Sequence, residues 1–331
     1  MNNILEVKNL STSFFTHAGE IKAVRDISFN VGSGEAIGIV GESGSGKSVT
    51  ALSIMNLLPY PGRIIRGSVC FAGTELTNLK ARKMQLVRGN EISIIFQDPM
   101  SSLNPVYTVG NQIMEPLIRH QKLKRGEARN KAIEMLSLVG IPGPENRLNL
   151  YPHEFSGGMR QRVMIAMALC CKPKLLIADE PTTALDVTIQ AQIIELLKDL
   201  EVNVNTSIIL ITHDLGVVAE LCNRVIVMYA GSVAEKGTTR DVFYNPRHPY
   251  TWGLLKSIPN ANAEQKKRLI PIDGQPPDLM HTPAGCPFCP RCAYAMQICA
   301  QEQPPLYRLS EQHLAACWLL HPSAPRVERG R

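Results

Sequence analysis

The sequence has no long hydrophobic run, no recognisable export signal and little excess charge. The longest uninterrupted apolar stretch, Val163–Cys171, spans nine residues, about half of the ~20 that a membrane-crossing helix needs. The first eight residues alternate like a strand and lack a charged segment followed by an apolar core. A net charge of +6 over 331 residues is too weak to indicate nucleic-acid binding. Any membrane role is therefore expected to come through partner proteins.

The composition is that of an ordinary globular protein, with 44% apolar and 19% charged residues. The length allows two units, and no internal repeat is visible. Four of the nine cysteines lie in apolar stretches, where small buried thiols in a reducing cytosol are expected: Cys70, Cys170, Cys171 and Cys222.

Strand patterns alternate with helix patterns over most of the chain, which is typical of a parallel sheet covered on both faces. The expected strands are residues 4–8, 23–31, 36–40, 91–96, 175–178, 207–212 and 224–235. The expected helices are residues 49–58, 106–120, 125–139, 158–171, 187–202 and 215–221. A helical insertion of about 103–158 interrupts the α/β pattern. Pro, His and Cys become frequent from residue 241, which predicts a domain over 1–240 and an extension over 241–331.

A phosphate-binding loop is indicated by Gly41-Glu-Ser-Gly-Ser-Gly-Lys47-Ser48, which follows an apolar strand and precedes a helix. Backbone N–H groups of such a loop turn inward around phosphate oxygens, and the helix dipole adds to their attraction. Lys47 is expected to reach the β- and γ-phosphates of a nucleotide, and Ser48 to bind Mg²⁺. The predicted nucleotide contacts are Gly41, Ser43, Gly44, Ser45, Gly46, Lys47, Ser48 and Val49.

Two carboxylates, Asp179 and Glu180, directly follow the apolar strand Leu175–Ala178. An acidic pair at the end of a buried strand is costly unless it meets a cation. We expect Asp179 to hold Mg²⁺ through water and Glu180 to polarise the attacking water. Together with the phosphate loop, this pair predicts an ATP- and Mg²⁺-dependent hydrolase.

Further motifs resemble those of ABC-type ATPases and occur in that family's order over roughly residues 4–240. They are Gln97 in Phe96-Gln-Asp-Pro99 (Q-loop), Phe155-Ser-Gly-Gly-Met-Arg-Gln161 (signature), Thr183-Ala-Leu-Asp186 (D-loop) and His213 in Ile211-Thr-His-Asp214 (switch histidine). The resemblance implies a RecA-like parallel sheet core with an antiparallel β subdomain and a helical subdomain.

The resemblance also implies roles for these residues. Gln97 would complete the coordination of Mg²⁺ or water, and His213 would contact the γ-phosphate. The N–H groups of Ser156, Gly157 and Gly158 would cap the γ-phosphate bound to a second ATPase chain, in a head-to-tail dimer. Asp186 would join the nucleotide site. Phe14 would stack on adenine, with Phe15 as the alternative.

Within this superfamily the chain most resembles the ATP-binding subunits of bacterial dipeptide and oligopeptide permeases. The segments that carry the likeness are residues 95–105, 179–190, Arg247-His-Pro-Tyr-Thr251 and the Cys-rich tail. The likeness implies an importer ATPase, peripheral on the cytoplasmic face of the inner membrane. Its partners would be a paralogous ATPase subunit, two transmembrane permeases and, indirectly, a periplasmic peptide-binding protein. Nickel and glutathione importers share much of the pattern. A soluble ABC protein acting on DNA or ribosomes would carry two cassettes or a coiled-coil insertion, which this chain lacks.

Five cysteines lie between residues 286 and 317, in a Pro-rich tail. Such a cluster in a reducing compartment favours a metal over disulfides, and thiolates suit Zn²⁺ or an iron–sulfur cluster. The family tail has the pattern C-x5-C-x6-C plus a distal Cys and is associated with a [4Fe–4S] cluster, for which Zn²⁺ is the alternative. The resemblance thus implies four ligands, Cys286, Cys292, Cys299 and Cys317. Cys289 is an extra thiol, and the metal is expected to staple the tail.

Overall fold

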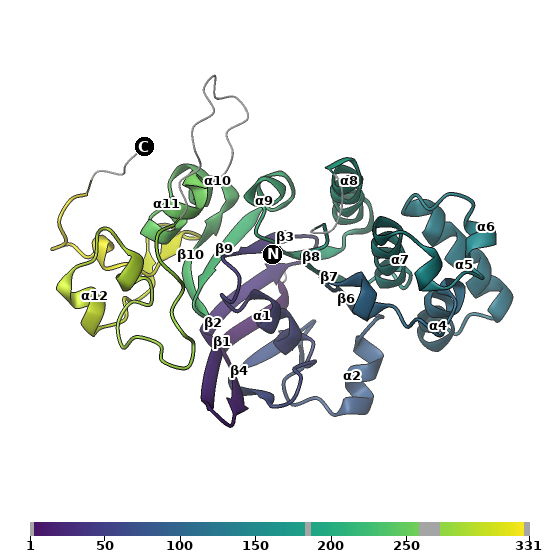
Figure 1. The fold of residues 1–331 in the computed structure, drawn as a ribbon, viewed down its shortest axis with the longest axis horizontal. Coiled ribbons are helices and arrows are strands. Elements are labelled where there is room, and N and C mark those ends of the chain that lie inside the picture. The colour runs from purple at the N-terminus through teal and green to yellow at the C-terminus, as the bar shows by residue number, and fades with distance from the viewer. Residues whose placement is uncertain (1–2, 183–186, 258–271, 328–331) are drawn as a thin grey trace, which may run out of the picture. The chain divides into compact units, whose positions relative to one another are not determined.

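The computed structural model describes residues 3–182, 187–257 and 272–327 (Figure 1). The chain divides into two compact units, each built from separate stretches of sequence. The first contains Met1–Leu5, Asn30–Ala36 and Cys70–Ile211, and the second contains Glu6–Phe29, Ile37–Val69 and Thr212–Arg331.

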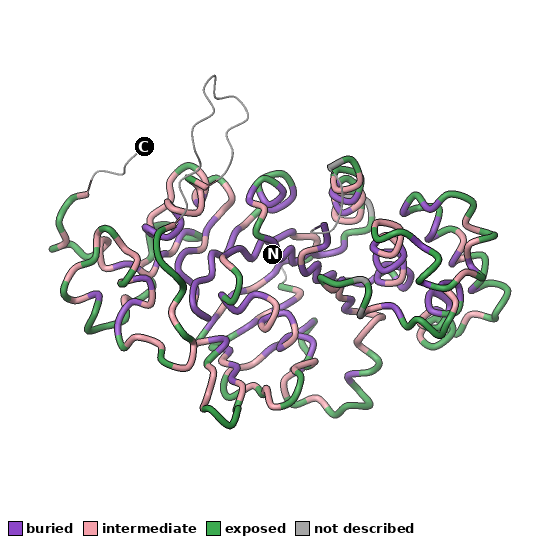
Figure 2. The backbone as a smooth tube through the Cα atoms, viewed as in Figure 1, coloured by how far each residue is buried: buried purple, intermediate pink, exposed green. Residues whose placement is uncertain are grey.

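Three parallel strands form the centre of the first unit, in the order β8, β7, β6. They are β6 (Ile92–Ile95), β7 (Leu175–Asp179) and β8 (Ser207–Ile211). Ile92 pairs with Leu175, and Asp179 pairs with Ile211. Both β7 and β8 are buried along their whole length (Figure 2), because helices cover parallel strands on both faces. Asp179 therefore stands at the carboxyl end of a buried strand.

Helices α4, α5 and α7 pack on one another in the helical part of the first unit (Figure 1). The side chain of Thr108 caps α4, and the Glu127 carboxylate accepts a hydrogen bond from the Lys124 N–H at the start of α5, which satisfies N–H groups left open in a first turn. The helices are α2 (Ala81–Val87), α3 (Pro99–Ser102), α4 (Val109–Gln121), α5 (Arg125–Leu138), α6 (Pro144–Arg147), α7 (Gly157–Leu169) and α8 (Val187–Val204), with a short 3-10 turn at Pro152–Glu154 and a strand β5 (Thr74–Glu75).

A mixed sheet lies in the second unit, in the order β11, β12, β10, β9, β3. Strand β3 (Ala36–Val40) is parallel to β9 (Arg224–Tyr229), and β10 (Ser232–Thr238) is antiparallel to β9. Two short strands of the tail, β11 (Tyr307–Arg308) and β12 (Leu314–Ala315), continue this sheet, with Ala315 opposite Glu235. The tail thus extends the sheet instead of forming one of its own.

A buried carboxylate fastens the tail to the sheet. Glu235, 0% exposed, accepts hydrogen bonds from the N–H groups of Arg247 and His248 and contacts the His313 ring at 2.7 Å. The remaining elements lie wholly or mostly in the second unit: β1 (Asn3–Thr16), β2 (Gly19–Gly32), β4 (Gly62–Phe71), α1 (Lys47–Ile54), α9 (Leu215–Leu221), α10 (Thr239–Tyr244), α11 (Pro249–Lys256), α12 (Gln297–Gln301) and 3-10 turns at Cys289–Arg291 and Trp318–Leu320.

The strands and helices expected from the sequence are present, and they differ from the expectation mainly at their ends. The expected strands 4–8 and 23–31 are parts of the longer β1 and β2, and the expected helix 49–58 is α1, which begins at Lys47 and ends at Ile54. Strand β4 and helix α2 were not predicted, because both carry charged and exposed residues that hide their period.

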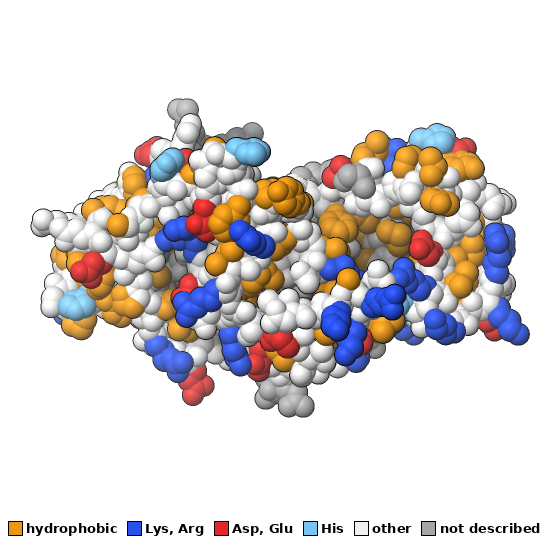
Figure 3. Space-filling model, turned by 90° about the horizontal axis from the view of Figure 1, so that it is seen from below, with side chains coloured by type: hydrophobic (Ala, Val, Ile, Leu, Met, Phe, Trp, Pro, Cys, Tyr) orange, Lys and Arg blue, Asp and Glu red, His pale blue; other side chains and the backbone are white. Residues whose placement is uncertain are grey.

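The character of the helices and the distribution of surface charge both bear on the expected class of protein. None of the helices in the described part of the chain combines the length and apolar character that crossing a membrane requires. On the face shown in Figure 3, basic side chains are scattered among acidic and apolar ones, in keeping with the modest net charge of +6.

Candidate functional site

The phosphate loop joins β3 to the N-terminus of α1, as the sequence predicts. Gly46 stands at the N-cap of α1 with φ 99°. A side chain there would collide with the carbonyl oxygen of Ala23, and one at Gly41 would collide with that of Met228. Both glycines are needed because neighbouring backbone passes where a Cβ would lie. Gly44 also has a positive φ, 76°, but has open space around it.

Two polar groups inside this loop are suited to an anion. Lys47 is 6% exposed, and its Nζ donates to the carbonyl oxygens of Gly41 and Glu42 at 2.7 and 2.9 Å. The Ser45 hydroxyl is buried and has no hydrogen-bond partner among the residues that the structure describes. A buried unsatisfied hydroxyl is costly, so a bound phosphate oxygen would relieve it.

The two carboxylates lie where the sequence places them, at the end of β7 in the first unit. Asp179 is 6% exposed, and Glu180 is half-buried with φ 49°, a strained value for a residue with a side chain. The Gln97 Nε2 donates to Glu180 Oε2 at 3.0 Å. The structure therefore brings together the Q-loop glutamine and the expected catalytic carboxylate.

The signature segment opens helix α7 in the same unit. The Ser156 side chain accepts a hydrogen bond from the Met159 N–H at 3.4 Å, and Ser156 and Gly157 are exposed. The buried Gln161 donates from Nε2 to the Pro181 carbonyl at 2.7 Å. This contact, which sequence reasoning missed, ties the signature helix to the residue directly after Glu180. The start of this helix is exposed, and the N–H groups at a helix start attract anions.

The remaining predicted nucleotide contacts have separate places. His213 is exposed on the turn before α9, whose first N–H groups bond to Asp214. Phe14 is half-buried beside Gly62, and Phe15 is 37% exposed with the Arg63 guanidinium 4.1 Å from its ring centre. The D-loop, with Asp186, lies outside the described residues.

The five tail thiols form one group in the second unit. Burial and the neighbouring thiolates Cys299, Cys292 and Cys289 raise the pKa of Cys286 to about 11. Burial and the thiolates of Cys286, Cys292 and Cys299 raise the pKa of Cys317 to about 12. The pKa of Cys292 is raised mainly by burial, with smaller contributions from Cys299 and Cys289.

Cys299 contributes to the raised pKa of Cys286, Cys292 and Cys317, and Cys289 contributes to that of Cys286 and Cys292. No disulfide joins the five. Within the described ranges, no three Cys, His, Asp or Glu side chains are arranged so that they could hold a metal ion.

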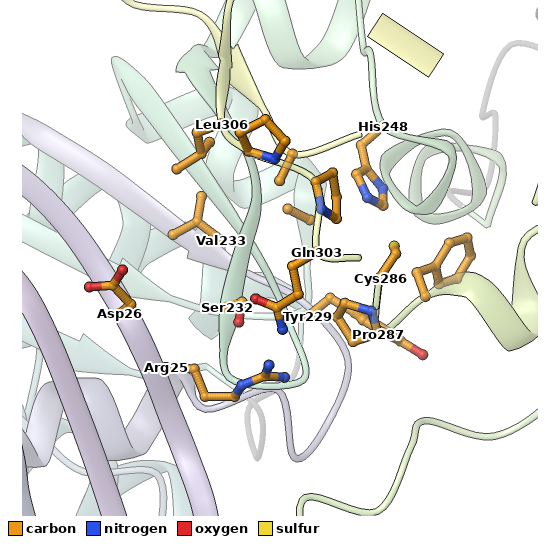
Figure 4. Close-up of a pocket in the computed structure, with 15 residues that line it drawn as sticks. Arg25, Asp26, Tyr229, Ser232, Val233, His248, Cys286, Pro287, Gln303 and Leu306 are labelled. Atoms are coloured by element: carbon orange, nitrogen blue, oxygen red, sulfur yellow. The ribbon is translucent and has the colours of Figure 1, made fainter. Parts of the chain in front are cut away.

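A cavity of about 230 Å³ lies beside this group, between β2, the β9–β10 hairpin and the tail. Cys286, His248 and Gln303 line it, and the Arg25 side chain points into it (Figure 4). The Arg25 Nη1 is buried and has no partner among the described residues. No phosphate-loop residue lines this cavity, so it is separate from the nucleotide contacts.

Comparison with known proteins agrees with the fold and the motifs. A family model for ABC transporters matches residues 24–183, and a model for the oligopeptide/dipeptide transporter C-terminal region matches residues 234–299. The ATP-binding cassette MJ0796, solved as a dimer in a post-hydrolysis state with ADP and phosphate, aligns at a TM-score of 0.66 and 29% identity, over 71% of this chain and 99% of its own. Fold and site together define an ABC-type ATPase.

The likeness to curated proteins extends over nearly the whole chain. The oligopeptide transport ATP-binding protein OppD of Bacillus subtilis (strain 168) is 56% identical over 329 residues, which cover 99% of this chain and 92% of the relative. The dipeptide transport ATP-binding protein DppD of the same organism is 54% identical over 96% of this chain and 95% of its own. The chain belongs to the family of ATP-binding proteins of oligopeptide and dipeptide ABC transporters.

Proposed function

We propose that this chain binds and hydrolyses ATP to drive the import of dipeptides or oligopeptides through transmembrane permease subunits. The observation that carries the proposal is the phosphate loop at the start of α1, with its buried Lys47 and its unsatisfied Ser45 hydroxyl. Peptide as the transported solute is supported by the names and the near full-length identity of the relatives.

In this function the loop N–H groups and Lys47 bind the phosphates of ATP. Ser48, Asp179 and Gln97 are the proposed ligands of Mg²⁺, directly or through water. The ion would neutralise the charge that builds up on the phosphates. Glu180 accepts a proton from the attacking water, oriented by the hydrogen bond from Gln97. His213 contacts the γ-phosphate, and Asp186 belongs to the same nucleotide site.

The exposed signature segment implies a second ATPase chain. Ser156, Gly157 and Gly158 would bind the γ-phosphate held by a paralogous subunit, and that subunit would do the same in return. The dimeric state of the cassette MJ0796 supports a pairing of two ATPase chains. The dimer would sit peripherally on the cytoplasmic face of the inner membrane, below two permease subunits fed by a periplasmic peptide-binding protein.

For the tail we propose a metal centre, a [4Fe–4S] cluster in preference to Zn²⁺, held by Cys286, Cys292, Cys299 and Cys317. The donor set supports this proposal: burial and neighbouring thiolates raise the pKa of Cys286 and of Cys317, and a bound cation would offset the repulsion between ionised thiols. Ligation would require the thiols to move closer than the described arrangement has them.

We propose the domain boundaries that the sequence predicts. An ATPase domain spans 1–240, with a helical subdomain at about 103–158, and an extension spans 241–331, with its Cys-rich segment at 286–317. The start of the matched C-terminal family region at residue 234 supports the second boundary.

Two measurements test these proposals. MgATP titration of the full chain and of Lys47→Ala should show binding in the first and its loss in the second, and equal affinities would overturn the nucleotide site. Purification without oxygen, followed by iron and sulfide analysis, tests the tail. A brown protein with about four irons per chain is expected, and a colourless, zinc-containing protein would replace the cluster by Zn²⁺.

A further inference from the structure

Glu42, the second residue of the phosphate loop, is held at three points. Its carbonyl oxygen accepts from the Lys47 Nζ at 2.9 Å. Its N–H donates to the hydroxyl of Tyr250 at 2.8 Å. Its carboxylate forms a two-bond ion pair with Arg291, at 2.6 and 2.9 Å. The residue thus joins the phosphate-binding lysine to two side chains that lie beyond the loop and its helix.

Arg291 is firmly placed. Its side chain is 3% exposed, and its guanidinium also donates to the carbonyls of Ile272 and Asp273 and to the Tyr229 hydroxyl. The same group lies about 6 Å from the ring centres of Tyr229 and Phe288. The hydrogen bonds that Arg291 donates to the Glu42 carboxylate raise the pKa of its guanidinium above the ordinary value. An arginine fixed by five hydrogen bonds can hold a loop in one position.

Tyr250 is equally constrained. It is 0% exposed, and its ring packs against Tyr229 and Phe288, with centres 4.6 and 5.4 Å away. Burial raises the pKa of its hydroxyl, which therefore remains a neutral acceptor for the Glu42 N–H. The oxygen that receives this bond is set by a packed aromatic cluster, not by a mobile side chain.

Both residues come from segments outside the motifs of the ATPase cassette. Tyr250 lies in Arg247-His-Pro-Tyr-Thr251, and Arg291 lies between the tail thiols Cys289 and Cys292. The two segments, about forty residues apart in the sequence, converge on one residue of the phosphate loop. Neither side chain is among the predicted nucleotide contacts.

We propose that Arg291 and Tyr250 are positioning residues of the ATP site. They hold Glu42 in place, and the Glu42 carbonyl in turn fixes the position of the Lys47 side chain. The C-terminal segment thereby sets the shape of the phosphate loop. The inference rests on the proposed function, because it assumes that this loop binds ATP. A loop already in its binding shape pays less ordering entropy when the ligand arrives.

The test is MgATP titration of the full chain carrying Arg291→Gln, Glu42→Gln or Tyr250→Phe. Hydrogen bonds between charged groups are strong, so the first two changes should each weaken MgATP binding about tenfold, and the third about threefold. Arg308→Gln and Tyr244→Phe change the same residue types at exposed positions and should leave the affinity unaltered. If these residues only helped the chain to fold, the substitutions would lower the thermal midpoint and leave the MgATP affinity of the folded protein unchanged.

The double variant Glu42→Gln/Arg291→Gln separates positioning from charge. If the pair positions the loop, the double variant binds MgATP as weakly as either single variant. If Arg291 only neutralises a carboxylate near the phosphates, the double variant regains wild-type affinity, which would overturn the proposal. If Arg291→Gln does not fold, Glu42→Gln and Tyr250→Phe decide alone. Wild-type affinity in Arg291→Gln defeats this inference only, whereas a wild-type chain that does not bind MgATP defeats the proposed function as well.

Discussion

Replacing Glu180 by Gln should separate ATP binding from ATP hydrolysis. The carboxylate is half-buried at the end of β7 and accepts a hydrogen bond from Gln97 at 3.0 Å. Glutamine has the same size and keeps one oxygen that can accept this bond, so the site should retain its shape. What it loses is the ability to take a proton from the attacking water.

General bases contribute about 10²–10⁴ to rate, which corresponds to roughly 3–5 kcal/mol of transition-state stabilisation. Hydrolysis by Glu180→Gln should therefore fall by at least about a hundredfold, while the Kd for MgATP changes by less than about threefold. Because ATP then persists, the dimer of the two ATPase subunits should accumulate in its closed form.

The assay is phosphate release by the dimer with the paralogous subunit's own site disabled, together with size-exclusion chromatography in MgATP. Glu91→Gln is the matched control, since Glu91 belongs to the same unit and its carboxylate forms an exposed ion pair with Lys174 at 3.0 Å. It should hydrolyse ATP at the wild-type rate. Wild-type turnover in Glu180→Gln would refute the role given to this carboxylate.

Three further predictions follow from other parts of the site and the tail. Gly46→Ala should lower the thermal midpoint of the nucleotide-free chain far more than Gly44→Ala. Both positions have a positive φ, which costs a residue with a side chain about 1–2 kcal/mol, but only a side chain at position 46 collides with the Ala23 carbonyl. Equal shifts of the midpoint would contradict this steric argument. Ser48→Ala should weaken the Mg²⁺ dependence of ATP binding, measured by titrating Mg²⁺ at fixed ATP, and an unchanged dependence would count against the loop assignment. Burial lowers the pKa of His248 from 6.5 to about 4 in the folded chain. Between pH 6.5 and 4 this histidine therefore binds a proton in the unfolded chain but not in the folded one, so the stability that it contributes above pH 6.5 is lost as the pH falls toward 4. Thermal unfolding across this range should show a smaller loss in His248→Asn, and an identical loss would show that another group is responsible.

Local patterns were sufficient to predict the motifs and the elements that carry them. The phosphate loop, the acidic pair after β7 and the helix that opens at Gly157 depend on short-range features: glycine spacing, an apolar run and a capping serine. Each is written in consecutive residues, so one sequence reveals it. The Gln97–Glu180 contact was also within reach, because parallel strands β6 and β7 end at the same edge of their sheet.

The contacts of the tail could not be predicted in this way. Arg291 meets Glu42 across 249 positions, and Tyr250 meets it across 208, so no local period signals either pair. Glu235 was equally hidden, since a carboxylate inside a strand pattern gives no sign of the three groups that satisfy it. The segment Arg247–Thr251 contributes to the likeness to peptide permease ATPases, but its residue types alone do not say what they contact.

Peptide import driven by ATP hydrolysis can be measured as the uptake of a labelled oligopeptide by vesicles that hold MgATP inside. The vesicles contain the two permeases and both ATPase subunits, and the peptide-binding protein is added outside. Accumulation of the peptide is expected to require enclosed MgATP and to be lost when this chain carries Lys47→Ala. Peptide uptake without ATP, or undiminished uptake with Lys47→Ala, would contradict the proposed function.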